Sequence, residues 1–203
     1  MVYDSIKTII IGDSSVGKSC ILYRFINNKY NPYICSTISV EHKIITIDYE
    51  QKKVKLAIWD IDGKGKFTNI LKTFNKDLQV VILVFDLTNK ESFNNIDLWI
   101  DRIKNEDINN YIFIVVGNKS DLKKKIKITN EEIIKKIINL QLDGYFECSA
   151  KNNDSIQEIF FSVIKLYSDM KNIIDYPLYN ENIKKSYNIK KNKCFLGCIR
   201  NLF

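Results

Sequence analysis

The stretch GDSSVGKS, residues 12–19, decides the fold of this 203-residue chain. It matches the pattern G-x-x-x-x-G-K-[ST], follows directly on the apolar run IKTIII, and opens a segment with helical spacing from about 17 to 27. In a strand–loop–helix unit of this kind, loop N–H groups bind phosphate oxygens, and the helix dipole favours their negative charge. The stretch therefore predicts a phosphate-binding loop at the carboxyl end of a buried parallel strand.

Strand-like and helix-like segments alternate on the C-terminal side of this loop. EHKIITIDYE at 41–50 and KKVKLAIWD at 52–60 both alternate with period two, and a short polar turn between them predicts a β-hairpin. Further buried strands are predicted at 80–86, 111–119 and 144–151, and helices near 91–105, 130–142 and 154–170. Strands joined by crossover helices predict an α/β fold with a mostly parallel sheet, whose ligands bind at the carboxyl ends of the strands.

Helical periodicity stops near the C-terminus, so we expect one domain over 1–172 and a flexible tail over 173–203. The net charge is +7, and residues 176–203 hold six basic residues against one acidic residue. Because the basic excess lies mostly in the tail, it favours an acidic membrane surface as partner, and we expect no nucleic acid. The five scattered cysteines favour a reducing compartment and hence a cytoplasmic location.

Two later segments carry side chains suited to a purine base. NKSD, residues 118–121, follows a predicted strand, and its aspartate can accept hydrogen bonds from both N1–H and the exocyclic amine of guanine, a pair that adenine does not offer. The stem of Lys119 can lie over the base. In ECSAK, residues 147–151, the Ala150 N–H can meet the guanine oxygen and Lys151 can flank the ring. Four polar residues after a strand are by themselves an ordinary loop, but together with the phosphate loop they predict a guanine nucleotide.

The segment DIDG, residues 60–63, supplies the third part of the predicted site. Asp60 ends a strand, where a carboxylate can reach Mg²⁺ through water, and the Gly63 N–H can meet the γ-phosphate. The Ser19 hydroxyl would bind Mg²⁺ and Lys18 would bridge the outer phosphates. Thr37 is a further candidate hydroxyl ligand for the metal.

These motifs, in this order and spacing, resemble the Ras-like small GTPases, and the Rab branch most closely. GDSSVGKSCILYRF, STISVEHKIITI, VKLAIWD, VFDLTNKESFNNIDLWI, VGNKSDL and ECSAK all follow the Rab pattern, over about residues 6–170. The resemblance implies a P-loop GTPase fold with a six-stranded, mostly parallel sheet flanked by five helices, and GTP/GDP with Mg²⁺ as ligands. It also implies switch segments near 30–42 and 60–77 that bind effectors, exchange factors and GTPase-activating proteins, and a peripheral position on the cytosolic face of an intracellular membrane.

The resemblance completes the set of predicted site residues, since Tyr30 matches the aromatic residue that stacks on guanine. The nucleotide-binding set is Gly12, Asp13, Ser14, Ser15, Val16, Gly17, Lys18, Ser19, Cys20, Tyr30, Thr37, Asn118, Lys119, Asp121, Ser149, Ala150 and Lys151. The metal set is Ser19, Thr37 and Asp60, and the catalytic set is Lys18, Gly63 and the altered position Lys64.

The segment WDIDGKGKF, residues 59–67, departs from the family pattern. The family's WDTAGQE is WDIDGKG here, so Lys64 stands where the family has glutamine and Asp62 where it has alanine. Other departures are Ser15 and Ser39 at positions where Rabs usually have glycine. The three switch positions at which Rabs carry the aromatic residues that read their partners hold His42, Trp59 and Phe74.

Replacement of the glutamine by Lys64 affects the expected hydrolysis. In the family the glutamine orients the attacking water, whereas a lysine ammonium has three donors and no acceptor and so cannot accept a hydrogen bond from that water. Asp62 adds a carboxylate near several negative phosphate oxygens, which is repulsive. We therefore predict that GTP is bound and hydrolysed slowly. The alternative is that Lys64 points into solvent and matters little, since relatives are also slow without a partner's arginine.

The sequence thus predicts a Rab-like GTP-binding switch in vesicle and intracellular protein transport, a small GTPase whose hydrolysis is slow or partner-dependent. The alternative is a GTP-locked scaffold that binds effectors without hydrolysis. An ATP-using phosphate-loop enzyme is disfavoured by residues 118–121. In the tail, Cys194 and Cys198 are followed by more residues than a CaaX signal allows, so palmitate on an anionic leaflet and an unanchored tail both stay open.

Overall fold

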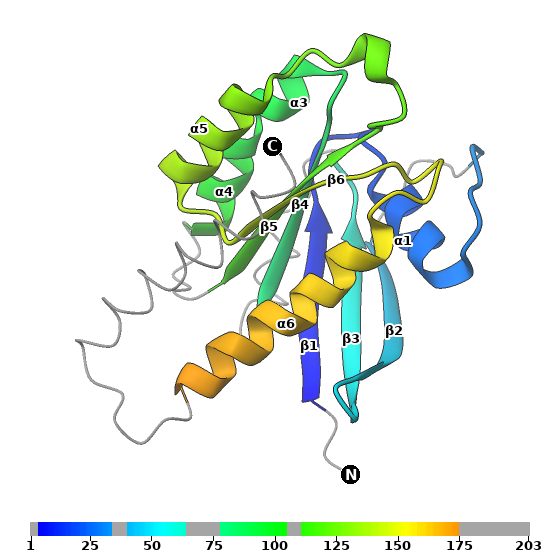
Figure 1. The fold of residues 1–203 in the computed structure, drawn as a ribbon, viewed down its shortest axis with the longest axis vertical. Helices are drawn as coiled ribbons and strands as arrows, with labels where there is room; N and C mark the ends of the chain where they lie inside the picture. The colour runs from blue at the N-terminus through cyan, green and yellow to red at the C-terminus, as the bar shows by residue number, and fades with distance from the viewer. Residues whose placement is uncertain (1–3, 34–39, 64–77, 105–110, 175–203) are drawn as a thin grey trace.

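The computed structural model describes residues 4–33, 40–63, 78–104 and 111–174. Six strands form one sheet in the order β2-β3-β1-β4-β5-β6 (Figure 1). Their bounds are β1 Asp4–Ile11, β2 Val40–Tyr49, β3 Lys52–Ile61, β4 Val80–Asp86, β5 Ile112–Asn118 and β6 Gly144–Glu147. Strands β2 and β3 are antiparallel and every other pair in the sheet is parallel. The predicted hairpin and the six-stranded, mostly parallel sheet are both confirmed.

The helices cover both faces of this sheet. They are α1 Lys18–Asn27, α3 Lys90–Asn94, α4 Ile96–Lys104, α5 Asn130–Leu140 and α6 Ile156–Ile174, with a 3-10 turn η2 at Lys123–Lys125. These are five α-helices within the described ranges, but α3 and α4 are separated by one residue and count as one place along the chain, so helices occur at four places, against the five that the resemblance implies. The stretch predicted as one helix near 91–105 is divided at Asn95 into α3 and α4.

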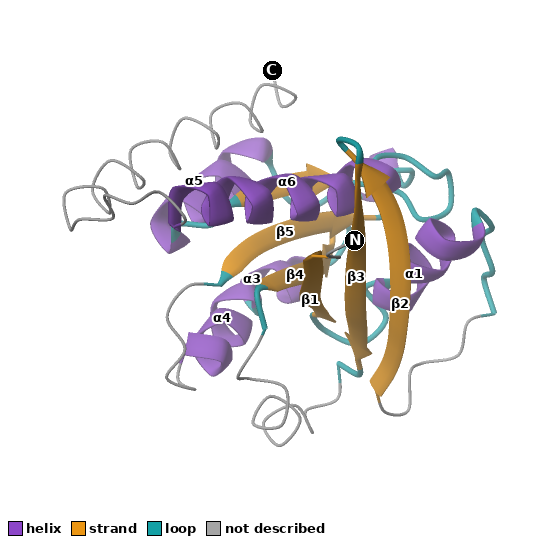
Figure 2. Cartoon of the chain, turned by 90° about the horizontal axis from the view of Figure 1, so that it is seen from below, coloured by secondary structure: helices purple, strands orange, loops and turns teal. Residues whose placement is uncertain are grey.

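The core is two apolar layers, one on each face of the sheet. Along β1, Ile6 and Ile10 face the layer that α1 and α6 cover, whereas Ile9 and Ile11 face α3, α4 and α5. Figure 2 shows the sheet lying between α6 and α4. Because successive strand side chains point to opposite faces and both faces are covered, a buried parallel strand is a continuous apolar run. This burial on both sides explains why the run IKTIII predicts a central strand.

Helix ends carry local signals that agree with the sequence. Helix α5 begins with a capping box, in which the Thr129 side chain accepts from the Glu132 N–H and the Glu132 side chain accepts from the Thr129 N–H. Helix α6 continues to Ile174, two residues beyond the expected domain boundary. No helix in the part of the chain described here is both long and apolar enough to span a bilayer.

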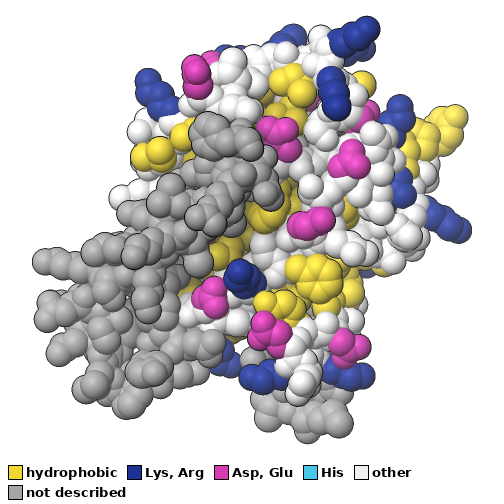
Figure 3. All heavy atoms as spheres, viewed as in Figure 1, with side chains coloured by type: hydrophobic (Ala, Val, Ile, Leu, Met, Phe, Trp, Pro, Cys, Tyr) yellow, Lys and Arg dark blue, Asp and Glu magenta, His cyan; other side chains and the backbone are white. Residues whose placement is uncertain are grey.

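Several predictions concern residues outside the described ranges. They are those on Thr37, Ser39, Lys64, Phe74, most of the two switch segments and tail residues 175–203, with Cys194 and Cys198. On the face shown in Figure 3, the Lys and Arg side chains that are drawn in colour lie among Asp and Glu side chains. That part of the surface is therefore mixed in charge.

Candidate nucleotide-binding site

The loop between β1 and α1 has the backbone geometry of a phosphate cradle. Gly12 and Gly17 have φ of 136° and 98°, in the region that favours glycine. A Cβ on Gly17 would lie 2.2 Å from the Asn118 Nδ2 atom, so the loop also needs glycine for close approach. Gly17 is the N-cap of α1 and makes no side-chain cap, and the first turn of α1 carries no acidic residue. The first N–H groups of α1 are thus suited to an anionic ligand.

Lys18 places a buried ammonium in this loop. Its side chain is 6% exposed, and Nζ donates to Gly12 O at 2.9 Å and to Asp13 O at 2.8 Å. Burial lowers the pKa of Lys18, and the nearby carboxylates of Asp60 and Asp62 offset part of that effect. A cation held in this way is well suited to bind phosphate oxygens.

Two predicted metal ligands meet at the end of β3. Asp60 is fully buried, and the Ser19 hydroxyl donates to its Oδ2 at 2.5 Å. Hydroxyl and carboxylate oxygens are the ligands that Mg²⁺ prefers, so this donor set fits the metal. A Cβ on Gly63 would lie 2.4 Å from Ser14 N, which shows that the turn after β3 packs directly on the phosphate loop.

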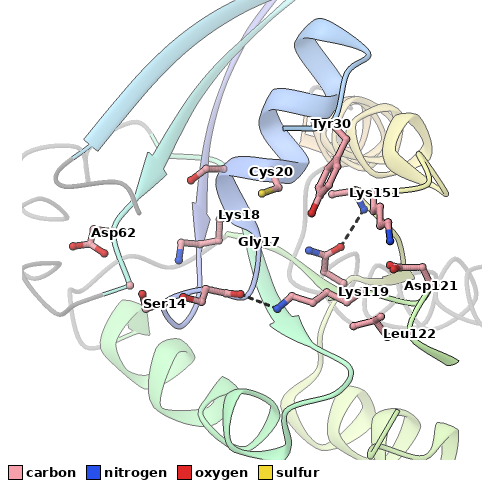
Figure 4. A pocket seen from close by; sticks show the side chains of 15 residues that line it. Ser14, Gly17, Lys18, Cys20, Tyr30, Asp62, Lys119, Asp121, Leu122 and Lys151 are labelled. Atoms are coloured by element: carbon pink, nitrogen blue, oxygen red, sulfur yellow. Dashed lines mark hydrogen bonds between the residues drawn. The ribbon is translucent and has the colours of Figure 1, made fainter. Parts of the chain in front are cut away.

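The loop after β5 is joined to the phosphate loop by two side chains. Asn118 Nδ2 donates to Val16 O at 2.9 Å, and Lys119 Nζ donates to Ser15 O at 3.0 Å. Figure 4 shows the bond between Lys119 and the phosphate loop, with Asp121 and Leu122 beyond it. The two motifs lie about half the chain apart in sequence, yet they form one structure.

Asp86, at the end of β4, orients Lys119 and was missed by the sequence reasoning. Its Oδ2 lies 2.6 Å from Lys119 Nζ, and Thr88 donates to Oδ1 through both N–H and hydroxyl. Desolvation acts to raise the pKa of Asp86, but the hydrogen bonds from Lys119 and Thr88 outweigh it and hold the pKa below its ordinary value. The sequence signal that could have identified Asp86 is its position as an acidic residue at the end of a buried apolar strand.

The loop after β6 supports the base-binding residues from behind. The buried Ser149 hydroxyl donates to Asp121 Oδ1 at 2.7 Å, which fixes the carboxylate expected to read guanine. The Ala150 N–H donates to Asn118 Oδ1 at 3.2 Å. A hydrogen bond from this N–H to a guanine oxygen would therefore have to share it with Asn118.

One cavity of about 420 Å³ joins these loops (Figure 4). Its volume is in the range typical of small-ligand sites. The predicted residues that line it are Ser14, Ser15, Gly17, Lys18, Ser19, Cys20, Tyr30, Gly63, Asn118, Lys119, Asp121, Ala150 and Lys151. Asp62 and Leu122 line it as well, although the predicted set did not contain them.

Five predicted residues do not line the cavity but are each hydrogen-bonded to a residue that does: Gly12, Asp13, Val16, Asp60 and Ser149. Asp13 differs most from its predicted role, because its carboxylate points to α4. Asn95, the residue between α3 and α4, donates through Nδ2 to Oδ2 at 2.7 Å, and Trp99 of α4 donates through Nε1 to Oδ1 at 2.8 Å. Asp13 thus ties the phosphate loop to α4, a contact that sequence spacing gave no means of finding.

The described part of the switch surface carries an aromatic pair. His42 on β2 stacks on Trp59 of β3, with ring centroids 4.4 Å apart and planes at 18°. The two residues are direct neighbours in the hairpin register. These are two of the three aromatic positions named from the Rab pattern; His42 is exposed and covers Trp59, which is only 8% exposed and belongs to the apolar core.

Comparison with known proteins agrees with this site. A model of the Ras family matches residues 7–169. Ras-related protein SEC4 of Saccharomyces cerevisiae is 38% identical over 169 residues, which is 82% of this chain and 77% of SEC4. Ras-related protein Rab-8B of Bos taurus is 32% identical over 200 residues, 95% of each chain, and Ras-related protein Rab-13 of Canis lupus familiaris is 37% identical over 164 residues, 80% of each. This chain therefore belongs to the Ras family of small GTPases and, within it, to the Rab branch.

Proposed function

We propose that this chain is a Rab-like switch in vesicle transport, which binds GTP or GDP with Mg²⁺ in the cavity between α1, β5 and β6. Ras-family proteins in general bind these ligands and hydrolyse GTP. The observation that carries the proposal is the convergence of the phosphate loop and residues 118–121 on one cavity, joined by the bond from Lys119 to Ser15 O. A Gly-rich turn without a phosphate-binding role would not be expected to be bonded to a loop with the side chains that bind guanine.

The residues have distinct roles in this proposal. The N–H groups of the phosphate loop and the Lys18 ammonium hold the outer phosphates. Asp121, fixed by Ser149, accepts from the guanine edge, while Tyr30 lies against the base. Ser19 and Asp60, with Thr37 from outside the described residues, would hold Mg²⁺, which neutralises charge on the phosphates.

The proposal also concerns the rate of GTP hydrolysis. Residues 62 and 64 carry a carboxylate and an ammonium where the family has alanine and glutamine. The turn at Gly63 packs on the phosphate loop and Asp62 lines the cavity, so this segment adjoins the position expected for the γ-phosphate. We infer slow hydrolysis unless a partner protein completes the site.

Titration with fluorescent guanosine and adenosine triphosphates tests the binding proposal. We expect saturable binding of the guanosine compound and at least a ~100-fold preference over the adenosine compound, because Asp121 accepts two donors that adenine lacks. Equal binding of both compounds, or binding of neither, would show the proposal to be wrong.

The altered segment favours a second candidate, a GTP-locked scaffold that binds effectors without a hydrolytic cycle. Chromatography of the nucleotide released from protein purified under native conditions separates the two. A cycling switch should release a substantial share of GDP, whereas stoichiometric GTP without GDP would support the scaffold.

A further inference from the structure

Arg24, near the C-terminal end of α1, joins that helix to the loop after β6. Its Nε donates to Ala150 O at 2.8 Å and its Nη2 donates to Lys151 O at 2.7 Å. These acceptors lie 126 and 127 residues away in the sequence. The loop that carries the predicted base-binding residues is thus held through its main chain by a side chain that does not line the cavity.

The same guanidinium also holds the end of α1 itself. Its Nη1 donates to Asn28 O at 3.1 Å, and the Asn28 N–H donates to Arg24 O at 2.9 Å. Asn28 is the C-cap of α1 in the left-handed conformation, with φ of 50°, and its side-chain oxygen accepts from Asn153 Nδ2 at 3.1 Å. The chain leaves α1 at this cap and reaches Tyr30 two residues later, so this network fixes the path to Tyr30.

Tyr30 and the loop after β6 form one edge of the cavity. Figure 4 shows Tyr30 and Lys151 near each other at its mouth. The Arg24 guanidinium carbon lies 5.9 Å from the Tyr30 ring centroid, at the outer limit of cation–π contact. Arg24 therefore touches both elements that would enclose a base, one through carbonyl oxygens and the other through the aromatic ring.

Arginine is suited to this position because of its geometry. A guanidinium is planar and carries five N–H donors, and here all three of its nitrogen atoms donate to main-chain carbonyl groups. A lysine at 24 would keep the positive charge but present it from a single nitrogen atom. Its three N–H groups would all leave that one atom, without the rigid planar fork by which three separate nitrogen atoms reach these carbonyl groups.

We propose that Arg24 is a positioning residue of the purine pocket, which fixes Tyr30 and the main chain at 150 and 151 relative to each other before a base binds. The inference rests on the proposed guanine-nucleotide function. Order present before binding lowers the entropic cost of binding, so its loss should appear mainly as faster dissociation. The loop at 150 and 151 is the part expected to face the 6-oxygen of guanine. Loss of the order that Arg24 imposes on this loop should therefore also weaken selectivity for the group at position 6 of the purine.

Three nucleotides separate positioning from a general loss of stability: GDP, inosine diphosphate, which lacks the 2-amino group, and the diphosphate of 2,6-diaminopurine riboside, which lacks the 6-oxygen and the N1–H. The lost N1–H contact to Asp121 is the same in every variant, so a change in preference between variants reports on the 6-position. Dissociation rates and affinities are measured for the full chain, for Arg24→Met and for Arg24→Lys. Lys29→Met is the matched control, because it removes a positive charge from the exposed segment before Tyr30 without removing any of these bonds.

For Arg24→Met we expect GDP to dissociate ~10–100-fold faster, and the preference for GDP over the diaminopurine nucleotide to fall ~10-fold. The preference for GDP over inosine diphosphate should stay within about twofold, because Asp121 is held by Ser149 and not by Arg24. Arg24→Lys should fall between Arg24→Met and the unchanged chain, and Lys29→Met should resemble the unchanged chain.

A wild-type dissociation rate in Arg24→Met would overturn the inference. So would an equal loss of affinity for all three nucleotides, because general destabilisation does not discriminate between base positions. A GDP dissociation rate in Arg24→Lys equal to that of the unchanged chain would show that the charge matters and the forked geometry does not. This result would also overturn the inference. Failure of the unchanged chain to bind any guanine nucleotide would remove the proposed function itself, and this result is visible before any variant is made.

Discussion

The purine end and the hydrolytic end of this cavity differ in how closely they follow the Rab pattern. At the purine end, NKSD and ECSAK are present in full, and Asp121, Lys119 and Asn118 are each held by side-chain hydrogen bonds. At the other end, residues 59–67 replace the family's glutamine and alanine with Lys64 and Asp62. Recognition of the base and cleavage of the phosphate are therefore encoded in separate regions, and one can change while the other is retained.

Loss of the purine end should have the largest effect. In Asp121→Asn, one carboxylate oxygen becomes an amide donor that opposes the N–H donors of guanine, while the remaining oxygen can still accept from Ser149. We expect the affinity for GDP to fall ~1000-fold and the affinity for xanthosine diphosphate, which offers an oxygen at position 2, to rise. Competition titration with both nucleotides measures the change.

Asp154→Asn is the control for that experiment, because it removes the same charge from an exposed residue of the neighbouring loop. It should bind GDP as the unchanged chain does. If Asp121→Asn kept the original preference for GDP over xanthosine diphosphate, Asp121 would not be the residue that reads the base.

Restoration of the hydrolytic end should have the next largest effect. In Lys64→Gln, the side chain regains an acceptor for the attacking water, and we expect single-turnover GTP hydrolysis to become ~10–1000-fold faster. The affinity for GDP should not change, since the purine end is untouched. This pair of results would show directly that the two ends act separately.

Lys66→Gln makes the same change two residues later and should leave the hydrolysis rate as it was. An identical rate in Lys64→Gln and the unchanged chain would mean that the lysine is not the cause of slow hydrolysis. Equal acceleration by both variants would mean that the net charge of the segment, and not the side chain at 64, controls the rate.

Local motifs made the purine end and the phosphate loop predictable. GDSSVGKS after IKTIII identifies the loop because strand, glycines and helix start are contiguous, and NKSD follows a continuous apolar strand. The division at Asn95 was not predicted, because the apolar spacing continues through it. The bonds from Asn95 and Trp99 to Asp13 were also not predicted, because they join residues 82 and 86 positions apart. Contacts of that kind follow from the sheet order, which the spacing of the strands does not determine.

The smallest predicted effect concerns Ser15, a departure within the phosphate loop. Ser15 has φ of 65°, in the left-handed region, where a residue with a Cβ is strained by roughly 1–2 kcal/mol. The bond from Lys119 uses the Ser15 carbonyl and so survives a change of side chain. Glycine also costs more backbone entropy on folding, so we expect Ser15→Gly to raise the free energy of unfolding by only about 0.5–1 kcal/mol.

Urea unfolding of the GDP- and Mg²⁺-saturated protein measures this difference, with the ligand concentrations held equal because bound nucleotide itself stabilises the fold. Ser14→Gly is the matched control. Ser14 is not among the described residues with positive φ, so the same replacement gains no strain relief there and should destabilise the protein by about 0.5–1 kcal/mol. Stabilisation by neither variant would mean that glycine relieves no strain at 15, and stabilisation by both would mean that the gain does not come from the positive φ of Ser15. If Ser15→Gly raises the free energy of unfolding and Ser14→Gly lowers it, the serine at 15 affects the stability of the phosphate loop. That effect is separate from the change in chemistry that Lys64 brings to the hydrolytic end.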